Sequence, residues 1–303
     1  MNQPLSLAAA AGASAGLLAG LFAGLLAGLL AGGTAYAQTP AANPMPDGSR
    51  DMYAGLGVQS APRYEGAASR RVSALPVLQV EWSNGVFISG MSAGMHLSAS
   101  PTVEFGPLLA VQPGRDGSGT GTAAGGIGAS ATVVKVAPRA PQAIEPAARL
   151  AGMDEIGARL QLGAFFNHYL SPQWRLSSSL LAGAVREHQG ARLELGVQRL
   201  GAVDGGRHHV SLAAGVGVVN RQYNATYFGV TADEAARSRF PAYEPGGGLQ
   251  DLHLGARWNW VFTPSWMLTS SLQARRLLGS ASRSPLTERP AELTVSTAIA
   301  YRF

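Results

Sequence analysis

From about residue 51 to its end, the sequence alternates between apolar and polar residues over long stretches, and no other feature constrains the fold as much. In the last segment, LTVSTAIAYRF, Tyr301 and Phe303 fall on one side of an extended strand and Arg302 on the other. Such segments run for about 10–14 residues. Strands of soluble proteins usually have about 5–6 residues, whereas a tilted strand needs about 9–11 to cross a bilayer. The pattern predicts an all-β fold, a transmembrane antiparallel β-barrel, with the edge strand of a soluble sheet as the alternative for the last segment.

Aromatic residues and connection lengths favour the same fold. We expect an aromatic girdle at the membrane interface, built from Trp82, Trp174, Trp258, Trp260 and Trp266. Short connections such as NG, SPQ, DGG and TPS alternate with long ones at 113–153, 222–247 and 279–290. Barrels of the outer membrane have short periplasmic turns and long outer loops. Because every backbone group in a bilayer must be paired, the last strand is expected to close against the first.

The number of strands is the weakest point of this interpretation. Eleven segments read clearly as strands, at 51–58, 75–83, 86–97, 102–112, 155–170, 173–185, 190–200, 207–220, 249–262, 265–278 and 291–303. Bacterial barrels have an even number. The segment SATVVKVAP, Ser130 to Pro138, would supply a twelfth strand. We therefore predict twelve strands, with ten as the alternative.

The first 50 residues differ from the rest. Residues 1–37 contain a long uncharged stretch rich in Ala, Gly and Leu, with small residues at Ala35 and Ala37, which is typical of a cleaved signal peptide. The glycines of that stretch recur every four residues, so an uncleaved membrane helix is the alternative. Residues 38–50 would form a periplasmic N-terminal linker, and 51–303 the outer-membrane β-barrel. The sequence thus predicts export to the outer membrane of a Gram-negative cell.

Composition excludes several classes of function. The chain has no cysteine, which excludes a disulfide framework and cysteine-bound zinc. Its net charge of +5 comes from scattered arginines, so we expect no nucleic-acid binding. No hydrolase, zinc-protease or nucleotide-binding motif occurs. The cluster His208, His209 and Ser211 comes closest to a catalytic group, but adjacent strand residues face opposite ways. We predict no catalytic residue, no metal and no cofactor.

Polar residues on the inward side of the strands are the candidate functional residues. They carry both charges and comprise Glu81, Arg159, Gln161, Arg192, Glu194, Asp251, His253, Arg257, Asn259, Gln273, Arg275 and Arg302. One interpretation is a self-paired network that makes the lumen rigid. The other is a narrow hydrated pore. A barrel of about twelve strands lies between the filled 8-stranded barrels and the open porins, so size does not decide.

Four blocks of sequence resemble the MltA-interacting protein family, also called MipA/OmpV. They are PRYEGAASRRVSALPVLQVEWSNGVFISG, EFGPLLAVQPGRD, NRQYNATYFGVTADEAARSRFPAYEPGGGL and SWMLTSSLQARRLLGSASRSPL, followed by the ending AIAYRF. The resemblance covers about residues 51–303, with a longer connection at Gly117–Ala148 than the family usually has. It implies an outer-membrane protein in which Tyr301 and Phe303 resemble the signal read by the barrel-assembly machinery.

The resemblance also implies a function. It suggests a non-enzymatic envelope scaffold that contacts outer-membrane lipid and links a murein transglycosylase to a murein synthase. Because the periplasmic turns are short, such partners would bind residues 38–50 or the barrel rim. The alternatives are a small-solute, porin-like channel and a lipid-modifying enzyme.

Overall fold

The structure is a computed structural model that describes residues 48–97, 100, 102–120, 126, 149–183 and 190–303. The chain divides into two units, Met1–Gln38 and Thr39–Phe303. The first unit lies outside the described residues, and with it the predicted signal peptide and most of the linker. Among the helices that the structure describes, none is both long and apolar enough to cross a bilayer.

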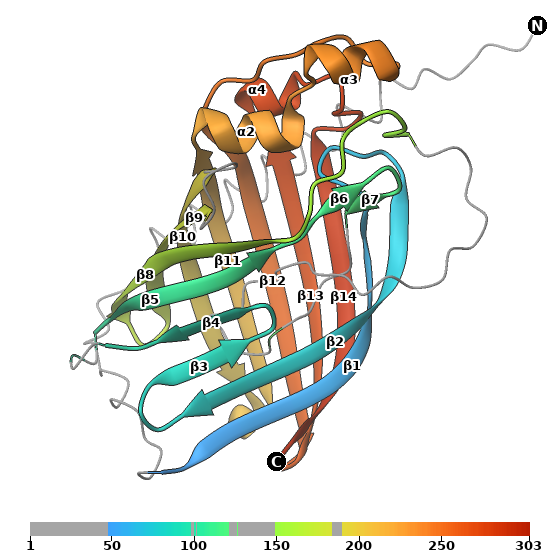
Figure 1. Cartoon of the computed structure of the whole chain (residues 1–303). Coiled ribbons are helices and arrows are strands. Elements are labelled where there is room, and N and C mark those ends of the chain that lie inside the picture. The colour runs from blue at the N-terminus through green and yellow to red at the C-terminus, as the bar shows by residue number, and fades with distance from the viewer. Residues whose placement is uncertain (1–47, 98–99, 101, 121–125, 127–148, 184–189) are drawn as a thin grey trace, which may run out of the picture. The chain divides into compact units, whose positions relative to one another are not determined.

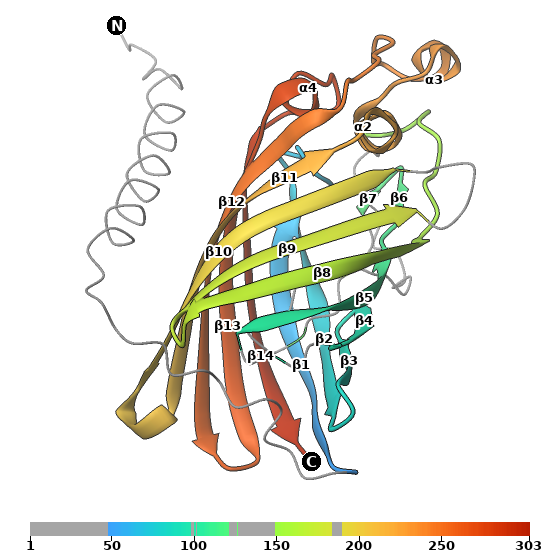
Figure 2. The same ribbon diagram turned by 90° about the vertical axis from the view of Figure 1, so that its left-hand side faces the viewer.

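The second unit is a closed β-barrel in which every neighbouring pair of strands is antiparallel (Figures 1 and 2). Twelve strands form the ring, in the order β1-β14-β13-β12-β11-β10-β9-β8-β5-β4-β3-β2. Their bounds are β1 Arg50–Pro62, β2 Arg70–Trp82, β3 Val86–Ser89, β4 Ser92–Met95, β5 Val103–Gln112, β8 Arg159–Ser171, β9 Trp174–Gly183, β10 Ala191–Val203, β11 His208–Val219, β12 Gly248–Thr263, β13 Trp266–Leu277 and β14 Ala291–Arg302. The predicted twelve-stranded barrel is confirmed.

The origin of the twelfth strand differs from the prediction. Residues 86–97 were expected to form one strand, but Gly90 adopts a φ of 58°, and the chain reverses there. The short strands β3 and β4 then pair with each other. Ser130 to Pro138 lies outside the described residues. Because β5 pairs directly with β8, the ring closes without that segment.

The first and last strands close the barrel. β1 pairs with β14 from Tyr53 and Arg302 to Ser60 and Val295. Outward side chains of these strands, such as Leu56, Val58 and Ile299, are 62%, 59% and 44% exposed. Large apolar side chains exposed all round a closed ring fit a lipid environment and would be unfavourable in water. The fold is therefore a transmembrane barrel.

Connections are short at one end of the barrel and long at the other. The end that carries the C-terminus has the tight turns, including Asn84–Gly85, where Gly85 has a φ of 85°. The opposite end carries α2 (Arg221–Phe228), α3 (Ala232–Arg237), α4 (Gly279–Ser282) and the small sheet of β6 (Arg115–Asp116) and β7 (Gly119–Thr120) (Figure 1). A 3₁₀ turn at Asp204–Gly206 joins β10 to β11.

The long connections pack into a cap with its own apolar core. Seven buried residues from four separate segments form this core: Tyr64, Ala67, Leu150, Met153, Val230, Phe240 and Leu286. Local sequence starts the helices, because Asn220 caps α2 and Thr231 with Glu234 forms a capping box on α3. A second cluster joins Phe228, Leu277 and Ala281, and so fastens α2 to the end of β13. The cap is thus a folded element at this end of the barrel.

Candidate functional site in the barrel lumen

The lumen contains a cavity of about 520 Å³ lined mostly by inward polar residues. Its lining extends from Glu65, Gln112 and Tyr223 beneath the cap to Glu81, His96 and Glu104 near the end with short turns. Both signs of charge line it. This cavity is the candidate functional site.

Ion pairs cross the lumen just below the cap. Asp251 is fully buried, and its Oδ2 lies 2.8 Å from Nη2 of Arg192, while its Oδ1 lies 3.0 Å from Nδ1 of His253. Arg192 also pairs with Glu194 and donates to Gln250 at 2.8 Å. Arg275 donates to Glu65 at 2.6 Å. We call Glu65, Arg192, Glu194, Asp251, His253 and Arg275 the lumen network.

Glycines of β11 make room for this network. The inward positions of β11 are small, and a Cβ at Gly217 would meet Asp251 Oδ2 at 2.7 Å and Arg192 Nη2 at 3.0 Å. A Cβ at Gly215 would meet the ring of His253 at 2.5 Å. In the sequence GVGV, the valines therefore face outward, whereas the glycines leave the inner face of the strand without side chains. Against that face, the side chains of β10 and β12 can reach each other.

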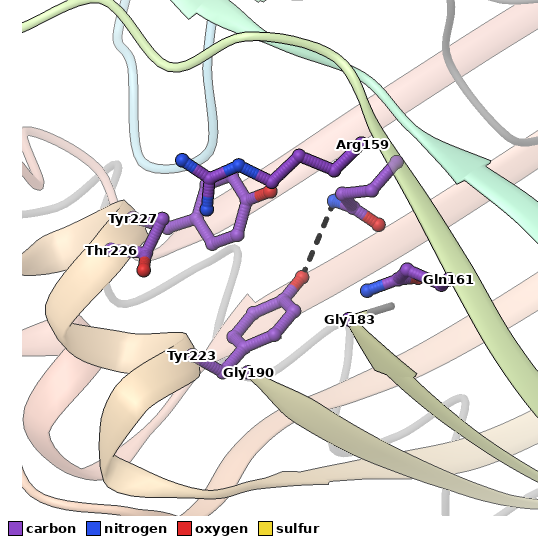
Figure 3. Close-up of a pocket in the computed structure, with 8 residues that line it drawn as sticks. Arg159, Gln161, Gly183, Gly190, Tyr223, Thr226 and Tyr227 are labelled. Carbon is purple, nitrogen blue, oxygen red and sulfur yellow. Dashed lines mark hydrogen bonds between the residues drawn. The ribbon is translucent and has the colours of Figure 1, made fainter. Parts of the chain in front are cut away.

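Helix α2 closes the lumen from above. Tyr223 is buried, and its hydroxyl lies 3.5 Å from both Arg192 Nη1 and Gln112 Nε2. Figure 3 shows Tyr223 and Tyr227 extending from α2 toward Arg159 and Gln161, around a pocket of about 10 Å³. A space of that size holds about one water molecule. Tyr223 thus links the cap to the lumen network.

The tyrosines of α2 make the stability of the cap depend on pH. Burial raises the pKa of Tyr223 to about 12, although the Arg192 guanidinium opposes this, and burial also raises the pKa of Tyr227. The neutral hydroxyl is therefore favoured in the folded state. The contribution of these tyrosines to the stability of the cap is fully present below the pKa of about 10 in the unfolded chain, and it is lost as the pH rises through the higher pKa of the folded state. We expect the cap to open between pH 10 and 12.

The measurement is protease sensitivity of the refolded barrel at increasing pH, with tyrosinate absorbance followed in parallel. Tyr223→Phe, which cannot ionise, should move the opening to higher pH. Cleavage within 221–247 that begins below pH 9 would contradict this explanation.

The other end of the lumen is more apolar. A buried cluster on the inner side of β2, β13 and β14 consists of Leu75, Val77, Met267, Ala298 and Ala300. Opposite, the ring of His96 lies 4.9 Å from that of Phe87 and 5.2 Å from that of Phe165. These groups narrow the lumen on both sides.

The structure brings most of the residues proposed from sequence around the same cavity. Those that line it are Glu81, Gln161, Arg192, Glu194, His253, Arg257, Gln273 and Arg275. Asp251 lies buried behind them in the network. Arg159 lines the small pocket under α2. Asn259 accepts a hydrogen bond of 2.7 Å from Thr269, and Arg302 pairs with Asp51 at 2.7 Å, close to the end of the strand.

Sequence reasoning missed several residues of the lumen. Arg175 and Gln198 are buried and hydrogen-bonded to each other, and the alternation of β9 and β10 could have placed both inward. Glu65 and Tyr223 come from connections, where no period exists to indicate that they face the lumen. Only the capping signal of Asn220 could have placed Tyr223 on a helix.

The proposed girdle residues all lie toward the end with short turns. Trp258, Trp260 and Trp266 are outward and 38–41% exposed. The rings of Trp258 and Trp260 are stacked 6.2 Å apart, and Trp266 meets Tyr301 edge-on at 5.0 Å. Tyr301 in turn meets Phe303 at 4.9 Å. Trp174 begins β9, with Arg199 over its ring, and Trp82 ends β2.

The histidine cluster is divided between the two sides of β11, with His209 on the same side as Ser211. His208 lies between Trp258 and Trp260 on the outer surface, and accepts a hydrogen bond of 3.2 Å from Trp258. Ser211 lines the cavity on the inner side. Within the residues that the structure describes, no group of three or more metal-ligating side chains occurs.

An apolar outer wall, a polar lumen and a packed cap define the class as a transmembrane β-barrel with an ion-paired interior. The chain belongs to the family described as MltA-interacting protein MipA, whose model matches residues 54–303. No curated protein matches the sequence.

Several solved barrels resemble the structure in outline. An outer-membrane channel from Pseudomonas putida F1 is 11% identical, with 87% of this chain and 99% of that chain covered and a TM-score of 0.38. The NanC porin is 7% identical, with 84% and 100% covered and a TM-score of 0.38. The translocator domain of the autotransporter NalP from Neisseria meningitidis is 11% identical, with 97% and 98% covered and a TM-score of 0.39. Similarity at this level carries no information on function.

Proposed function

We propose that this protein is an outer-membrane barrel that acts as a non-enzymatic scaffold in the cell envelope, with a lumen that does not conduct. One observation carries the proposal: the cap and the strands share the lumen network, through Tyr223 on Arg192 and Glu65 on Arg275. Opening the lumen would leave buried charges without partners, which costs several kcal/mol per ion. A barrel sealed in this way serves as a membrane-fixed platform.

The orientation follows from the connections. Short turns and the C-terminal end of β14 face the periplasm, and the cap faces outward. Residues 1–37 act as the export signal, and residues 38–50 form a periplasmic linker next to β1. The family description names MltA as a partner. By that resemblance the partners are a murein transglycosylase and a murein synthase, held by the linker and the periplasmic rim.

The second candidate, a channel for small solutes, is favoured by the cavity of about 520 Å³. In that case the cap would be a gate, and movement of α2 would precede conduction. Arg257 and Arg275 line the cavity and would set the ion preference.

Single-channel recording of the refolded barrel in a planar bilayer separates the two candidates. The scaffold predicts a silent membrane, with current only when Tyr223→Ala removes the bond between cap and network. Discrete steps in the unaltered protein, with a selectivity that changes in Arg257→Glu, would overturn the scaffold and establish the channel.

Capture of the purified transglycosylase by the barrel completes the test. Deletion of 38–50 should abolish capture, whereas Arg239→Glu, an exposed change in the cap, should not affect it. A barrel that neither conducts nor captures the enzyme would refute both candidates.

A further inference from the structure

Three arginines lie on the outside of the barrel at the cap end of β2, β13 and β14. Arg70 of β2 reaches across β1, where it donates to the Ser60 carbonyl at 2.9 Å and to the Leu293 carbonyl of β14 at 2.6 Å. Arg276 of β13 lies opposite Ala291, beside the same stretch of β14. Arg289 precedes β14 and is exposed. All three residues thus lie at the cap end of β14, either beside this strand or just before it.

Among the residues that the structure describes, this group of arginines has no acidic counterpart on the same surface. The side chains of Arg276 and Arg289 make no hydrogen bond or ion pair with any residue that the structure describes. The neighbouring acids are engaged elsewhere: Glu288 pairs with Arg149 at 2.9 Å and accepts from Ala68, and Glu292 accepts from the Gly66 amide. Three exposed arginines at the same end of β14, without an anion beside Arg276 and Arg289 among the described residues, point to an anionic partner from outside the chain.

The position of these arginines along the membrane normal identifies that partner. Along β13, Arg276 stands ten residues beyond Trp266 of the girdle. With about 3.3 Å per residue and a strand tilt of about 40°, this separation corresponds to about 25 Å along the membrane normal. The apolar band of an outer-membrane barrel is also about 25 Å tall. Between the two levels the wall is apolar, with Leu272, Leu293 and Val295 exposed.

We propose that Arg70, Arg276 and Arg289 form a binding site for the phosphate groups of the glycolipid of the outer leaflet, a phosphorylated lipid A. Acyl chains lie along the apolar wall of β13, β14 and β1, and the phosphates meet the guanidinium groups above it. Arg70 is fixed in place by Ser60 and Leu293, and so offers a preformed donor at little cost in entropy. The proposal rests on the outward orientation of the cap proposed above.

The test is native mass spectrometry of the refolded barrel in detergent, titrated with bisphosphorylated lipid A. Arg276→Gln combined with Arg289→Gln removes two charges at side chains without described partners, so the fold should persist. We expect this variant to bind lipid A at least about tenfold more weakly, as for loss of a charge-assisted hydrogen bond. The control, Arg207→Gln, removes one exposed arginine charge at the end with short turns and should bind like the unaltered protein.

Two further lipids define the specificity. Dephosphorylated lipid A should bind the unaltered and the double variant equally weakly. Equal affinity of both proteins for bisphosphorylated lipid A would overturn the site, and so would phosphatidylglycerol binding as tightly as lipid A. The measurement involves no murein enzyme and no voltage. If the unaltered barrel conducts and the double variant loses lipid A binding, only the scaffold proposal is refuted. If the unaltered barrel is silent and the double variant still binds lipid A, only the proposed lipid site is refuted.

Discussion

Replacing Asp251 by Ala lowers the free energy of unfolding of the barrel by about 3–5 kcal/mol, the range for removing one partner of a buried ion pair. Asp251 is fully buried and is shared by Arg192 at 2.8 Å, His253 at 3.0 Å and Arg275 at 3.8 Å. Without it, two arginines that the low-dielectric lumen holds close together lose a common anion. The measurement is urea unfolding of the refolded barrel, followed by tryptophan fluorescence.

The matched control is Glu244→Ala. Glu244 pairs with Arg221 at 2.7 Å, nearly the same distance, but the two side chains are 83% and 70% exposed. Water screens such a pair, so we expect a loss of at most about 1 kcal/mol. If both variants lose the same free energy, burial of the lumen network contributes nothing, and the argument for a sealed lumen fails with it.

Replacing Gly57 by Ala destabilises the barrel at its closing seam. A Cβ at Gly57 would overlap the carbonyl oxygen of Thr297 and the side chain of Ala298 on β14. These are backbone and short side-chain atoms that cannot rotate away, so β1 and β14 must separate. We expect a loss of about 1–3 kcal/mol, as for overpacking elsewhere, together with a lower yield of folded barrel. Mobility of unheated samples on gels reports that yield.

Gly201→Ala in β10 is the control, and it should have the opposite sign. At Gly201 a Cβ meets nothing closer than Val210 oxygen at 3.9 Å. Alanine there should stabilise the strand by about 0.5–1 kcal/mol, because glycine loses more backbone entropy on folding. Equal destabilisation by both substitutions would mean that the seam has no special packing.

Period-two alternation was sufficient to predict the barrel because a strand exposed to lipid must show it along its whole length. It located β12 and β14 almost to the residue, and it gave the inward direction of Arg192 and His253. The same rule failed at 86–97. One strand was expected to run through Gly90, but the chain turns back on itself at that glycine.

The cap could not be predicted in the same way. Its core joins residues as distant as Tyr64 and Leu286, and no local pattern specifies such a contact. Phe228, Val230 and Leu286 belong to those parts of the family-like blocks that form the cap, and their burial explains why apolar residues occur in connections. The residue pairs of the lumen network could not be predicted either. Alternation tells which side chains face inward, but not which of them lie at the same level along the barrel axis.

The wall of the barrel is not equally firm all the way round. β2 pairs with β1 along its whole length but with β3 only from Gln79 to Glu81, and β4 meets β5 only from Ser92 to Gly94. Few backbone hydrogen bonds must break for this sector to open, so its local opening free energy is low compared with that of β11 to β13. In hydrogen exchange, the amides of β3 and β4 will lose protection first. The sector between β2 and β5 is therefore the part of the barrel wall that opens locally most often, while the long strands opposite stay paired.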